Sequence, residues 1–483
     1  MRKASPIKIS GVAADNSLRI NPVIADQLSE KCCVRVSPEG YLKALFFFTI
    51  TACFVIYLGF IWSGAIISIA AWTIIPLLLW FDCVEFDGKS LTRKGPIAAI
   101  GRLLSAKLRR LKITDIQLVE TQSSWTLKTG GRVFYRYRSE ISGSDMLFAF
   151  ASGGKGYRQM IKTLFSVVPE DKLDARSIEL RDFLVEPKKL KQKIKKLKLP
   201  STDALDGALP KIKRSKAPRD NRQNLYQIEE NAEMSSYKSV ELRQVANELR
   251  IAGNFPQAME AYRRALLWQP ENAWLLFEFS RGLFSYANAA KNGRWRRRAL
   301  AALRLAARRG GSDANLLARI GESYFQAGDF EAAAKTFRRT LEVQPENFRA
   351  ECGLGEIGLQ EGKIAHVVHH FQAAARFARD AATKRWAQSE AEYFSLLNSN
   401  FKYMETEFSR ISWLDSVTNA RLICLRLLFT GLPMILIGAL VSETLAVLGW
   451  AITAVTGLMW AILMLADKFL DSRANPSQIL EDD

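Results

Sequence analysis

The chain has 483 residues, of which 48% are hydrophobic, and a formal net charge of +19 at pH 7. This length allows two to four domains, and the apolar content excludes a disordered chain. Six cysteines are scattered, with only Cys32 and Cys33 adjacent, so the sequence has neither a disulfide framework nor a zinc pattern and predicts a reducing compartment.

Two uncharged apolar runs follow the first 41 residues. They cover 44–60 and 65–81, and only the letters IWSG separate them. Each run is about the length of a helix that crosses a bilayer, roughly 17–25 residues, so the short connector predicts a transmembrane hairpin over 42–82. The alternative is a buried hairpin of a soluble domain, but these runs have no polar face to meet water.

Between this hairpin and residue 185, apolar residues tend to recur at every second position, which is the period of a β-strand. Strand candidates are followed by one helix candidate, and in order they lie at 84–95, 111–122, 132–141, 145–152 and 156–168. This order predicts a small, mostly antiparallel barrel or sandwich over 83–185. The order and the pattern ITDIQLVE resemble the bacterial pleckstrin-homology-like domains, and the resemblance implies binding, not catalysis.

Positive charge is concentrated in the next segment, 186–235. Four prolines interrupt it, so it is predicted to be a linker. Seven lysines lie within eleven residues: Lys188, Lys189, Lys191, Lys193, Lys195, Lys196 and Lys198. The segment is either a solvated spacer or a contact with anionic lipid. Nucleic-acid binding is disfavoured, because the sequence has no aromatic–basic platform and no recognised nucleic-acid-binding fold.

The tetrapeptide QPEN occurs twice, at 269–272 and 344–347, each time after an apolar run with helical spacing. The second copy closes the 34-residue unit 314–347. Its small residues Gly321 and Ala333, its aromatic residues and its final proline resemble the tetratricopeptide repeat (TPR). The resemblance implies helix pairs that stack into a solenoid with a concave face.

Three further units extend this pattern. They cover 239–272, 273–313 and 348–381, and a capping helix is predicted at 383–397. The second unit carries a seven-residue insertion, which is best placed near YANAAKNGRW. The whole repeat region is predicted to cover 236–400.

The resemblance implies that the first helix of each pair lines the concave face. Candidate residues of a peptide-binding groove there are Arg243, Asn247, Trp274, Phe277, Arg281, Phe284 and Arg319. Arginines beside aromatic residues predict an acidic or aromatic-anchored peptide. Arg243, Asn247 and Arg319 partly match the carboxylate clamp of chaperone-binding members, but Glu278 and Asn315 depart from it. The alternative is a solvated groove without a single ligand.

No motif in the chain requires an enzyme. The sequence has no catalytic-triad signature, phosphate loop or paired-carboxylate motif, and no catalytic residue or cofactor is predicted. In HVVHH (366–370), His366 and His370 share a helix face. No carboxylate or cysteine partner is evident, so no metal site is predicted.

Two more apolar runs, 422–440 and 445–466, predict a second hairpin over 422–467. Gly449, Thr453 and Gly457 recur every four residues and form a small-residue face on which helices pack. Two hairpins give four crossings and leave every long segment on one side. Lys and Arg flank the runs on that side and are absent from both short connectors, which predicts that both termini and all soluble parts are cytoplasmic.

The sequence therefore predicts a multidomain membrane protein of the bacterial cytoplasmic (inner) membrane. It combines an α-helical TPR solenoid, a small mostly-β domain and two transmembrane helical hairpins. The predicted segments are 1–41 (N-terminal), 42–82 (hairpin), 83–185 (β-rich domain), 186–235 (linker), 236–400 (repeats), 401–421 (connecting segment), 422–467 (hairpin) and 468–483 (tail). The leading function is a membrane-anchored scaffold that recruits a protein partner. The alternative is an accessory subunit of a membrane export, envelope-assembly or polymer-synthesis machine.

Overall fold

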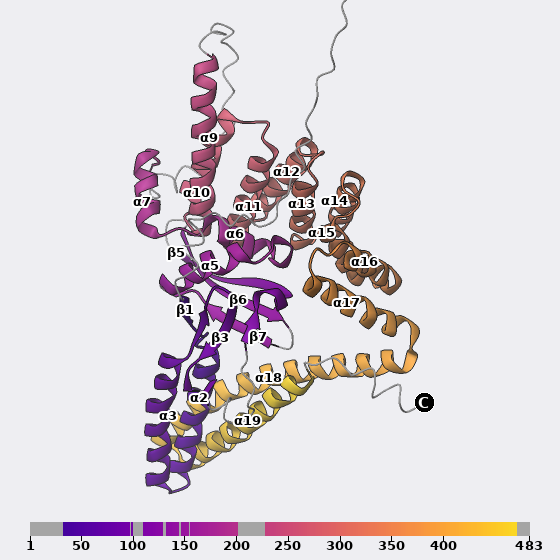
Figure 1. Ribbon diagram of the computed structural model, residues 1–483. Helices are drawn as coiled ribbons and strands as arrows, with labels where there is room; N and C mark the ends of the chain where they lie inside the picture. The colour runs from indigo at the N-terminus through magenta and orange to yellow at the C-terminus, as the bar shows by residue number, and fades with distance from the viewer. Residues whose placement is uncertain are drawn as a thin grey trace, which may run out of the picture.

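The computed structural model describes residues 32–470 except 97, 100–109, 129–131, 144–145, 154 and 201–227. Figure 1 shows long paired helices at one end, a β-rich body in the middle and a stack of shorter helix pairs at the other end. The molecule is mostly helical, as the sequence predicts.

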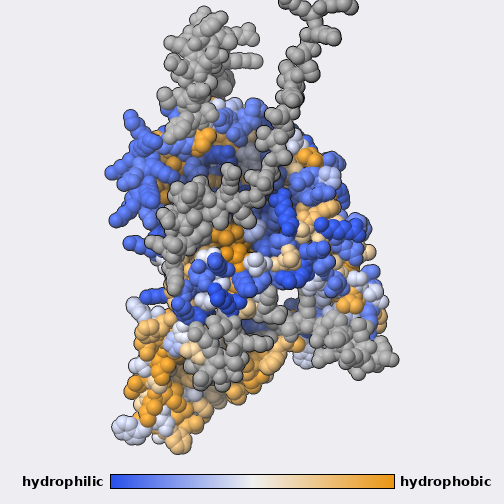
Figure 2. Space-filling model, in the orientation of Figure 1, coloured by the Kyte–Doolittle hydropathy of each residue, from blue (hydrophilic) through white to orange (hydrophobic). Residues whose placement is uncertain are grey.

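The long paired helices are α2 (Glu39–Tyr57) with α3 (Ile61–Phe81), and α18 (Phe401–Val441) with α19 (Glu443–Leu470). In the described part of the chain, three segments have the length and composition of a membrane-crossing helix: Gly40–Tyr57, Ile61–Phe81 and Glu443–Asp467. The predicted crossing 422–440 is the C-terminal half of α18. Figure 2 shows that the surface at this end of the molecule is largely hydrophobic.

The two hairpins contact each other. The Trp450 ring of α19 stacks on Tyr57 of α2 at 5.2 Å between centroids and lies 6.2 Å from Phe54. Residues 401–421, predicted as a separate connecting segment, are helical and continuous with the first helix of the hairpin. Asn400 is the single residue between α17 (Ala381–Ser399) and α18, and its side chain caps α18 by accepting from the Tyr403 amide at 2.9 Å.

The β-rich body consists of two antiparallel sheets, as the sequence predicts. One sheet has the order β1 (Cys32–Arg35), β2 (Cys83–Phe86), β3 (Ser90–Lys94) and β4 (Arg110–Lys112). The other has the order β5 (Leu118–Lys128), β6 (Arg132–Gly143) and β7 (Met146–Ala151). Helix α5 (Lys155–Val167) buries its apolar face against both sheets. The resemblance to pleckstrin-homology-like domains stays a prediction.

One strand of this body comes from before the first hairpin. Strand β1 pairs with β2 in antiparallel register, with Arg35 opposite Cys83. The α2–α3 hairpin returns the chain to its starting level, and this places both strands side by side. Part of the predicted N-terminal segment therefore belongs to the β-rich domain.

The start of the predicted linker is also ordered. Helix α7 (Pro187–Lys196) buries Leu190 among apolar residues of α9 (Ile228–Ile251) and α10 (Phe255–Trp268). Two of its lysines reach α9: Lys193 Nζ lies 2.5 Å from Glu248, and Lys196 Nζ lies 2.7 Å from Glu241. The structure thus differs from a free spacer here, because apolar contacts and ion pairs hold α7 on the repeats. Residues 201–227 of the linker lie outside the described residues.

The repeats are four helix pairs and a ninth helix. They are α9 (Ile228–Ile251) with α10 (Phe255–Trp268), α11 (Ala273–Ala289) with α12 (Gly293–Arg309), α13 (Ala314–Gln326) with α14 (Phe330–Val343), α15 (Phe348–Gln360) with α16 (Ile364–Phe377), and α17 (Ala381–Ser399). Each QPEN lies between pairs. Its asparagine caps the next helix: Asn272 accepts from the Leu275 amide and Asn347 from the Ala350 amide, both at 3.0 Å.

The insertion in the second unit lengthens both of its helices. Helices α11 and α12 have 17 residues each, against 13 in α13 and 14 in α14. The extra turns carry Tyr286 and Trp295, whose rings are 5.3 Å apart. Tyr286 contacts Phe255 at 5.8 Å, and Phe255 contacts Tyr135 of β6 at 6.3 Å. The insertion therefore helps to dock the β-rich body onto the repeats.

Candidate peptide-binding groove

The concave side of the repeats is partly filled by the chain's own β-rich domain. A short 3-10 turn, η2 (Glu170–Lys172), and helix α6 (Ala175–Phe183) lie there. Asp174 caps α6 by accepting from the Ser177 amide at 2.8 Å. One side of α6 buries Ile178 and Leu180 in the β-rich core. Its other side faces the repeats, so α6 is packed between the two domains.

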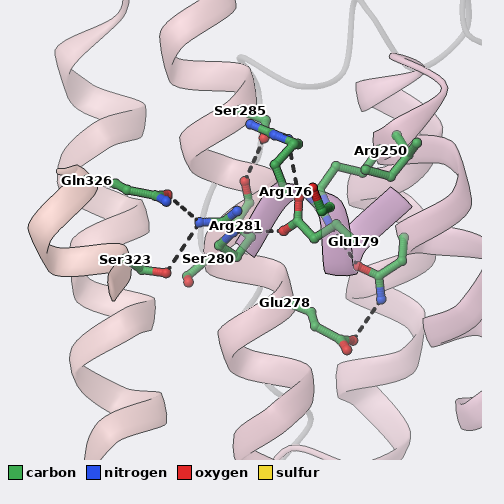
Figure 3. Close-up of polar contacts among 12 residues, drawn as sticks. Arg176, Glu179, Arg250, Glu278, Ser280, Arg281, Ser285, Ser323 and Gln326 are labelled. Atoms are coloured by element: carbon green, nitrogen blue, oxygen red, sulfur yellow. Dashed lines mark hydrogen bonds and ion pairs between the residues drawn. The ribbon is translucent and has the colours of Figure 1, made fainter. Parts of the chain in front are cut away.

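Glu179 of α6 is the centre of this interface (Figure 3). Its carboxylate accepts from Arg281 of α11 at 2.9 Å, from Arg250 of α9 at 3.0 Å and from Arg176 at 3.2 Å. Burial alone would raise the pKa of this carboxyl, but the guanidinium groups of Arg250, Arg281 and Arg176 outweigh burial and hold the pKa well below its usual range. Glu179 is therefore a buried anion that joins two repeats to the β-rich domain.

The turn before α6 binds the next two repeats. Glu170 forms ion pairs with Arg319 of α13 and with Arg181. Arg349 of α15 donates to the carbonyl oxygens of Glu170 at 2.6 Å and Leu173 at 2.9 Å. Successive first helices thus contribute one arginine each to segment 170–183, which is how a solenoid holds an extended ligand along its concave face.

The contact continues to the capping helix. Lys172 of η2 is 2% exposed, and its ammonium lies 2.9 Å from Asp380, which caps α17.

Backbone contacts join β6 to the first repeat, at the other end of the interface. The Val133 amide donates to the Gly253 carbonyl at 2.9 Å. The Tyr137 hydroxyl donates to the Ile251 carbonyl, also at 2.9 Å.

The remaining polar residues predicted for the groove are satisfied within the repeats. Arg243 donates twice to Glu278, at 2.7 Å each. Asn247 is buried, donates to Glu278 at 2.8 Å and accepts from the Tyr262 hydroxyl at 2.7 Å. Because Glu278 and Glu170 neutralise Arg243 and Arg319, these residues do not form an open carboxylate clamp.

The three predicted aromatic residues divide between two clefts. Phe284 lines one cleft, of about 290 Å³, together with Tyr135 of β6. Trp274 and Phe277 lie edge-to-face at 6.0 Å and both line a second cleft, between segment 170–183 and the repeats. Phe277 is 7% exposed and belongs to the core of the repeats. Trp274 is half-buried, donates from its indole nitrogen to Asp313 at 2.8 Å and is the more exposed of the two.

Two clefts remain between segment 170–183 and the repeats. They have volumes of about 410 Å³ and 400 Å³, and both are lined by Glu170, Trp274 and Arg319. Arg243 and Arg281 line the first cleft, and the exposed Asn315 lines the second. The predicted groove is thus reduced to two clefts with Trp274 at their junction.

Another cleft, also of about 290 Å³, gathers acidic side chains from both domains. Glu120 comes from β5, Glu322 from α13 and Glu356 from α15. The Glu356 side chain still reaches solvent, yet loss of water within the cleft, reinforced by Glu322 and Glu120, raises its pKa to about 7. One carboxylate oxygen of Glu322 is buried without a hydrogen-bond partner.

The histidines of HVVHH lie on α16. His370 contacts Glu351 of α15 at 2.7 Å through Nδ1. Within the described residues, no group of three or more His, Cys, Asp or Glu side chains could hold a metal ion.

Sequence reasoning missed Glu170 and Glu179. Neither residue belongs to a motif, and each lies far from its repeat partners in the sequence: 71 positions from Arg250 and 102 from Arg281 for Glu179, and 149 from Arg319 for Glu170. The available signal was the arginine that recurs on the first helices, at Arg250, Arg281, Arg319 and Arg349. Such a series predicts an anionic ligand but does not say that the ligand is in the same chain.

Comparison with known proteins agrees with the helix pairs. Residues 314–347 match the family model of a tetratricopeptide repeat. No curated protein matches the chain.

Similar solved structures include MamA, with 16% identity over 31% of this chain and 82% of that chain, at a TM-score of 0.25. They also include the APC/C hetero-tetramer Cut9–Hcn1, with 12% identity over 64% of this chain and 51% of that chain, at a TM-score of 0.28. Yeast Tom70 has 16% identity over 50% of this chain and 55% of that chain, at a TM-score of 0.23. With scores this low, the repeat assignment depends on residues 314–347 and on the packing of the helix pairs.

Proposed function

We propose that this chain is a membrane-anchored TPR scaffold that recruits a protein partner to the cytoplasmic face of a membrane. The observation that carries the proposal is the direct connection of the body formed by the β-rich domain and the repeats to the long paired helices at both ends. Helix α3, which is apolar, ends at Phe81 and β2 begins at Cys83, while α17 ends at Ser399 and α18, whose C-terminal half is apolar, begins at Phe401. A solenoid held this way is kept close to the membrane surface.

The proposed topology puts both termini, the repeats and α7 in the cytoplasm and both hairpins in the bilayer. It is supported by lysines and arginines beside the apolar runs and their absence from the short connectors. Cysteines introduced at Lys188 and at Leu58 would be labelled with an impermeant thiol reagent in intact cells. We expect labelling at Leu58 only, and labelling at Lys188 would overturn the topology.

We propose that the partner enters the two clefts that meet at Trp274. Because the arginines there already have carboxylate partners, an aromatic or apolar anchor of the partner supplies the binding energy, with polar contacts at the rim. Trp274→Ala should abolish recovery of the partner by crosslinking in membranes. Trp268→Ala is the matched control, because Trp268 is 52% exposed on α10 and lines neither cleft.

The second candidate is the accessory subunit of a membrane export, envelope-assembly or polymer-synthesis machine. The contact of Trp450 with Tyr57 favours it, because two hairpins that serve only as anchors do not need to pack together. Exchanging both hairpins for unrelated ones distinguishes the candidates. A scaffold keeps its activity after the exchange, whereas a subunit that contacts a channel or synthase through its hairpins loses it.

A further inference from the structure

Helix α12 carries an unusual concentration of arginine. Its 17 residues include seven arginines and no Lys, Asp or Glu. Arg309 pairs with Glu271 at 2.8 Å, and Arg296 donates to the Ala327 carbonyl. Among the described residues, no carboxylate pairs with the five others, all exposed: Arg294, Arg297, Arg298, Arg304 and Arg308.

These arginines surround a narrow apolar line. The buried side of α12 carries Ala299, Leu303 and Ala306. On the opposite side, Ala301 and Leu305 are exposed and lie one turn apart, with Leu305 37% exposed. At 3.6 residues per turn, Arg298 lies on one side of this line, Arg297, Arg304 and Arg308 lie on the other, and Arg294 continues the line toward the N-terminus.

This pattern does not stabilise the helix that carries it. Arg294 and Arg298 are four residues apart, as are Arg304 and Arg308, and like charges at this spacing repel. Arg294 and Arg296 also lie in the first turn, where the helix dipole disfavours cations. The groove arginines, by contrast, are paired with carboxylates of this chain. The charge on α12 is therefore left for an anion outside the described residues.

Position and chemistry narrow the choice of that anion. Figure 1 shows α12 at the end of the molecule opposite to α2 and α3, so a bilayer that holds these hairpins cannot reach it. Nucleic acids stack bases on aromatic rings, but Trp295 is covered by Tyr286 at 5.3 Å and by Arg298 at 4.6 Å. Guanidinium groups on both sides of an apolar line complement a helix with carboxylates on both sides of an apolar line.

We infer that the exposed face of α12 docks an acidic amphipathic helix of a protein partner. The inference rests on the proposed scaffold function, because it names the chemistry of a recruited partner. The surface is separate from the clefts at Trp274, since α12 is the second helix of its pair and lines neither of them.

The test measures direct binding to the purified full chain in nanodiscs of neutral lipid. The probe is a fluorescent synthetic helical peptide of the length of α12, with leucines along one line and glutamates on both sides. Binding should saturate, and a peptide with glutamine for glutamate should bind at least about ten-fold more weakly. The double variant Arg297→Glu/Arg304→Glu should weaken binding at least about ten-fold, and Leu305→Gln about five-fold.

Lys384→Glu/Arg385→Glu is the matched control, because it makes the same change in charge on the exposed side of α17. It should leave peptide binding unchanged. Equal losses in both double variants, or no loss in the α12 variants, would overturn the inference. Tighter, α12-dependent binding of single-stranded RNA or of anionic vesicles would assign the surface to nucleic acid or to a second membrane instead. Because this assay needs no cellular partner, its outcome is independent of the crosslinking and hairpin-exchange experiments.

Discussion

The carboxylate of Glu179, on α6 of the β-rich domain, accepts a hydrogen bond of 2.9 Å from Nε of Arg281, on α11 of the repeats. Both side chains are buried, and the residues are 102 positions apart. Arg250 approaches the same carboxylate from α9. The repeats and the β-rich domain are thus joined through a shared buried ion cluster and not through the connecting chain alone.

Removal of this carboxylate should weaken the whole body. Glu179→Ala leaves Arg250 and Arg281 buried without their anion, and breaking a buried pair in this way costs about 3–5 kcal/mol. The free energy of unfolding in denaturant should fall by this amount. Asp182→Ala is the control, because Asp182 is exposed on the same helix and, within the described residues, forms an ion pair with its neighbour Arg181 alone. Equal stability of the two variants would contradict the central place of Glu179.

Protonation of Glu179 should lower the stability of the folded protein in acid. Its pKa is lowered in the folded protein from the ordinary value of 4.5, so the folded state holds the ionised form. The contribution of Glu179 is therefore complete above pH 4.5 and is lost as the pH falls toward the lowered pKa. We expect the unfolding free energy to decline below pH 4.5 in the wild type. A Glu179→Gln variant should decline less, and parallel curves for both proteins would refute the assignment.

Glu356, in the acidic cleft, should have the opposite effect: stability should fall as the pH rises toward and past neutrality. The pKa of Glu356 is raised to about 7 by loss of water and by Glu322 and Glu120, so the folded state favours the protonated acid. Its contribution is present below the unfolded value of 4.5 and is lost as the pH rises through 7. Glu356→Gln should therefore raise the melting temperature at pH 8 and change it little at pH 5. A larger gain in melting temperature at pH 5 than at pH 8 would show that the pKa of Glu356 is not raised in the folded protein.

The close packing of the repeats predicts a steric effect at Gly321. A Cβ atom there would lie 2.6 Å from the Phe337 ring, which also lies 2.4 Å from a Cβ placed on Gly353. The ring cannot move away from one glycine without approaching the other. Gly321→Val should lower the unfolding free energy by about 1–3 kcal/mol. Gly293→Ala, where a Cβ meets no atom within 4 Å, should be neutral.

The position of α7 bears on the lipid contact that the sequence predicts for its lysines. Lys193 and Lys196 are paired with α9, and four further lysines of α7 are exposed, Lys188, Lys189, Lys191 and Lys195. Figure 1 shows α7 beside α9, at the end of the molecule opposite to α2 and α3, so a bilayer that holds these hairpins does not reach it. The exposed amines should therefore react with an acylating reagent at equal rates in nanodiscs of anionic and of neutral lipid, with Lys384 as the internal reference. A slower reaction in anionic nanodiscs, lost as the Debye length shrinks from about 10 Å at 0.1 M salt to about 3 Å at 1 M, would show that α7 does contact the lipid.

The local features of the repeats could be predicted from the sequence, because each depends on neighbours in the chain. Gly321 and Phe337 lie within one 34-residue unit, and the QPEN asparagines cap the helices that follow them directly. The hairpin around Gly88 is equally local, and its φ of 83° is one that glycine adopts without strain.

The assembled groove could not be predicted in the same way. The arginines of the first helices face the concave side, but the sequence does not reveal that Glu170 and Glu179 reach them from another domain. Helix α7 was not predicted from the sequence, for a related reason. Its lysines and flanking prolines indicate a spacer, while Leu190, with the partly buried Ile194 and Leu197, fixes it to α9 and α10. The spacing of these apolar residues is helical, but it does not reveal which elements they contact.

Helix α18 has one more consequence. Its 41 residues run without interruption from the end of the repeats to the tip of the second hairpin, a length of roughly 60 Å. Arg421 and Asp467 join it to α19 by an ion pair. A change of about 10° in the tilt of a helix of this length moves its far end by roughly 10 Å. In the proposed arrangement, with the second hairpin in a bilayer, tilt adapts to bilayer thickness, so the height of the repeats above the surface would follow that thickness.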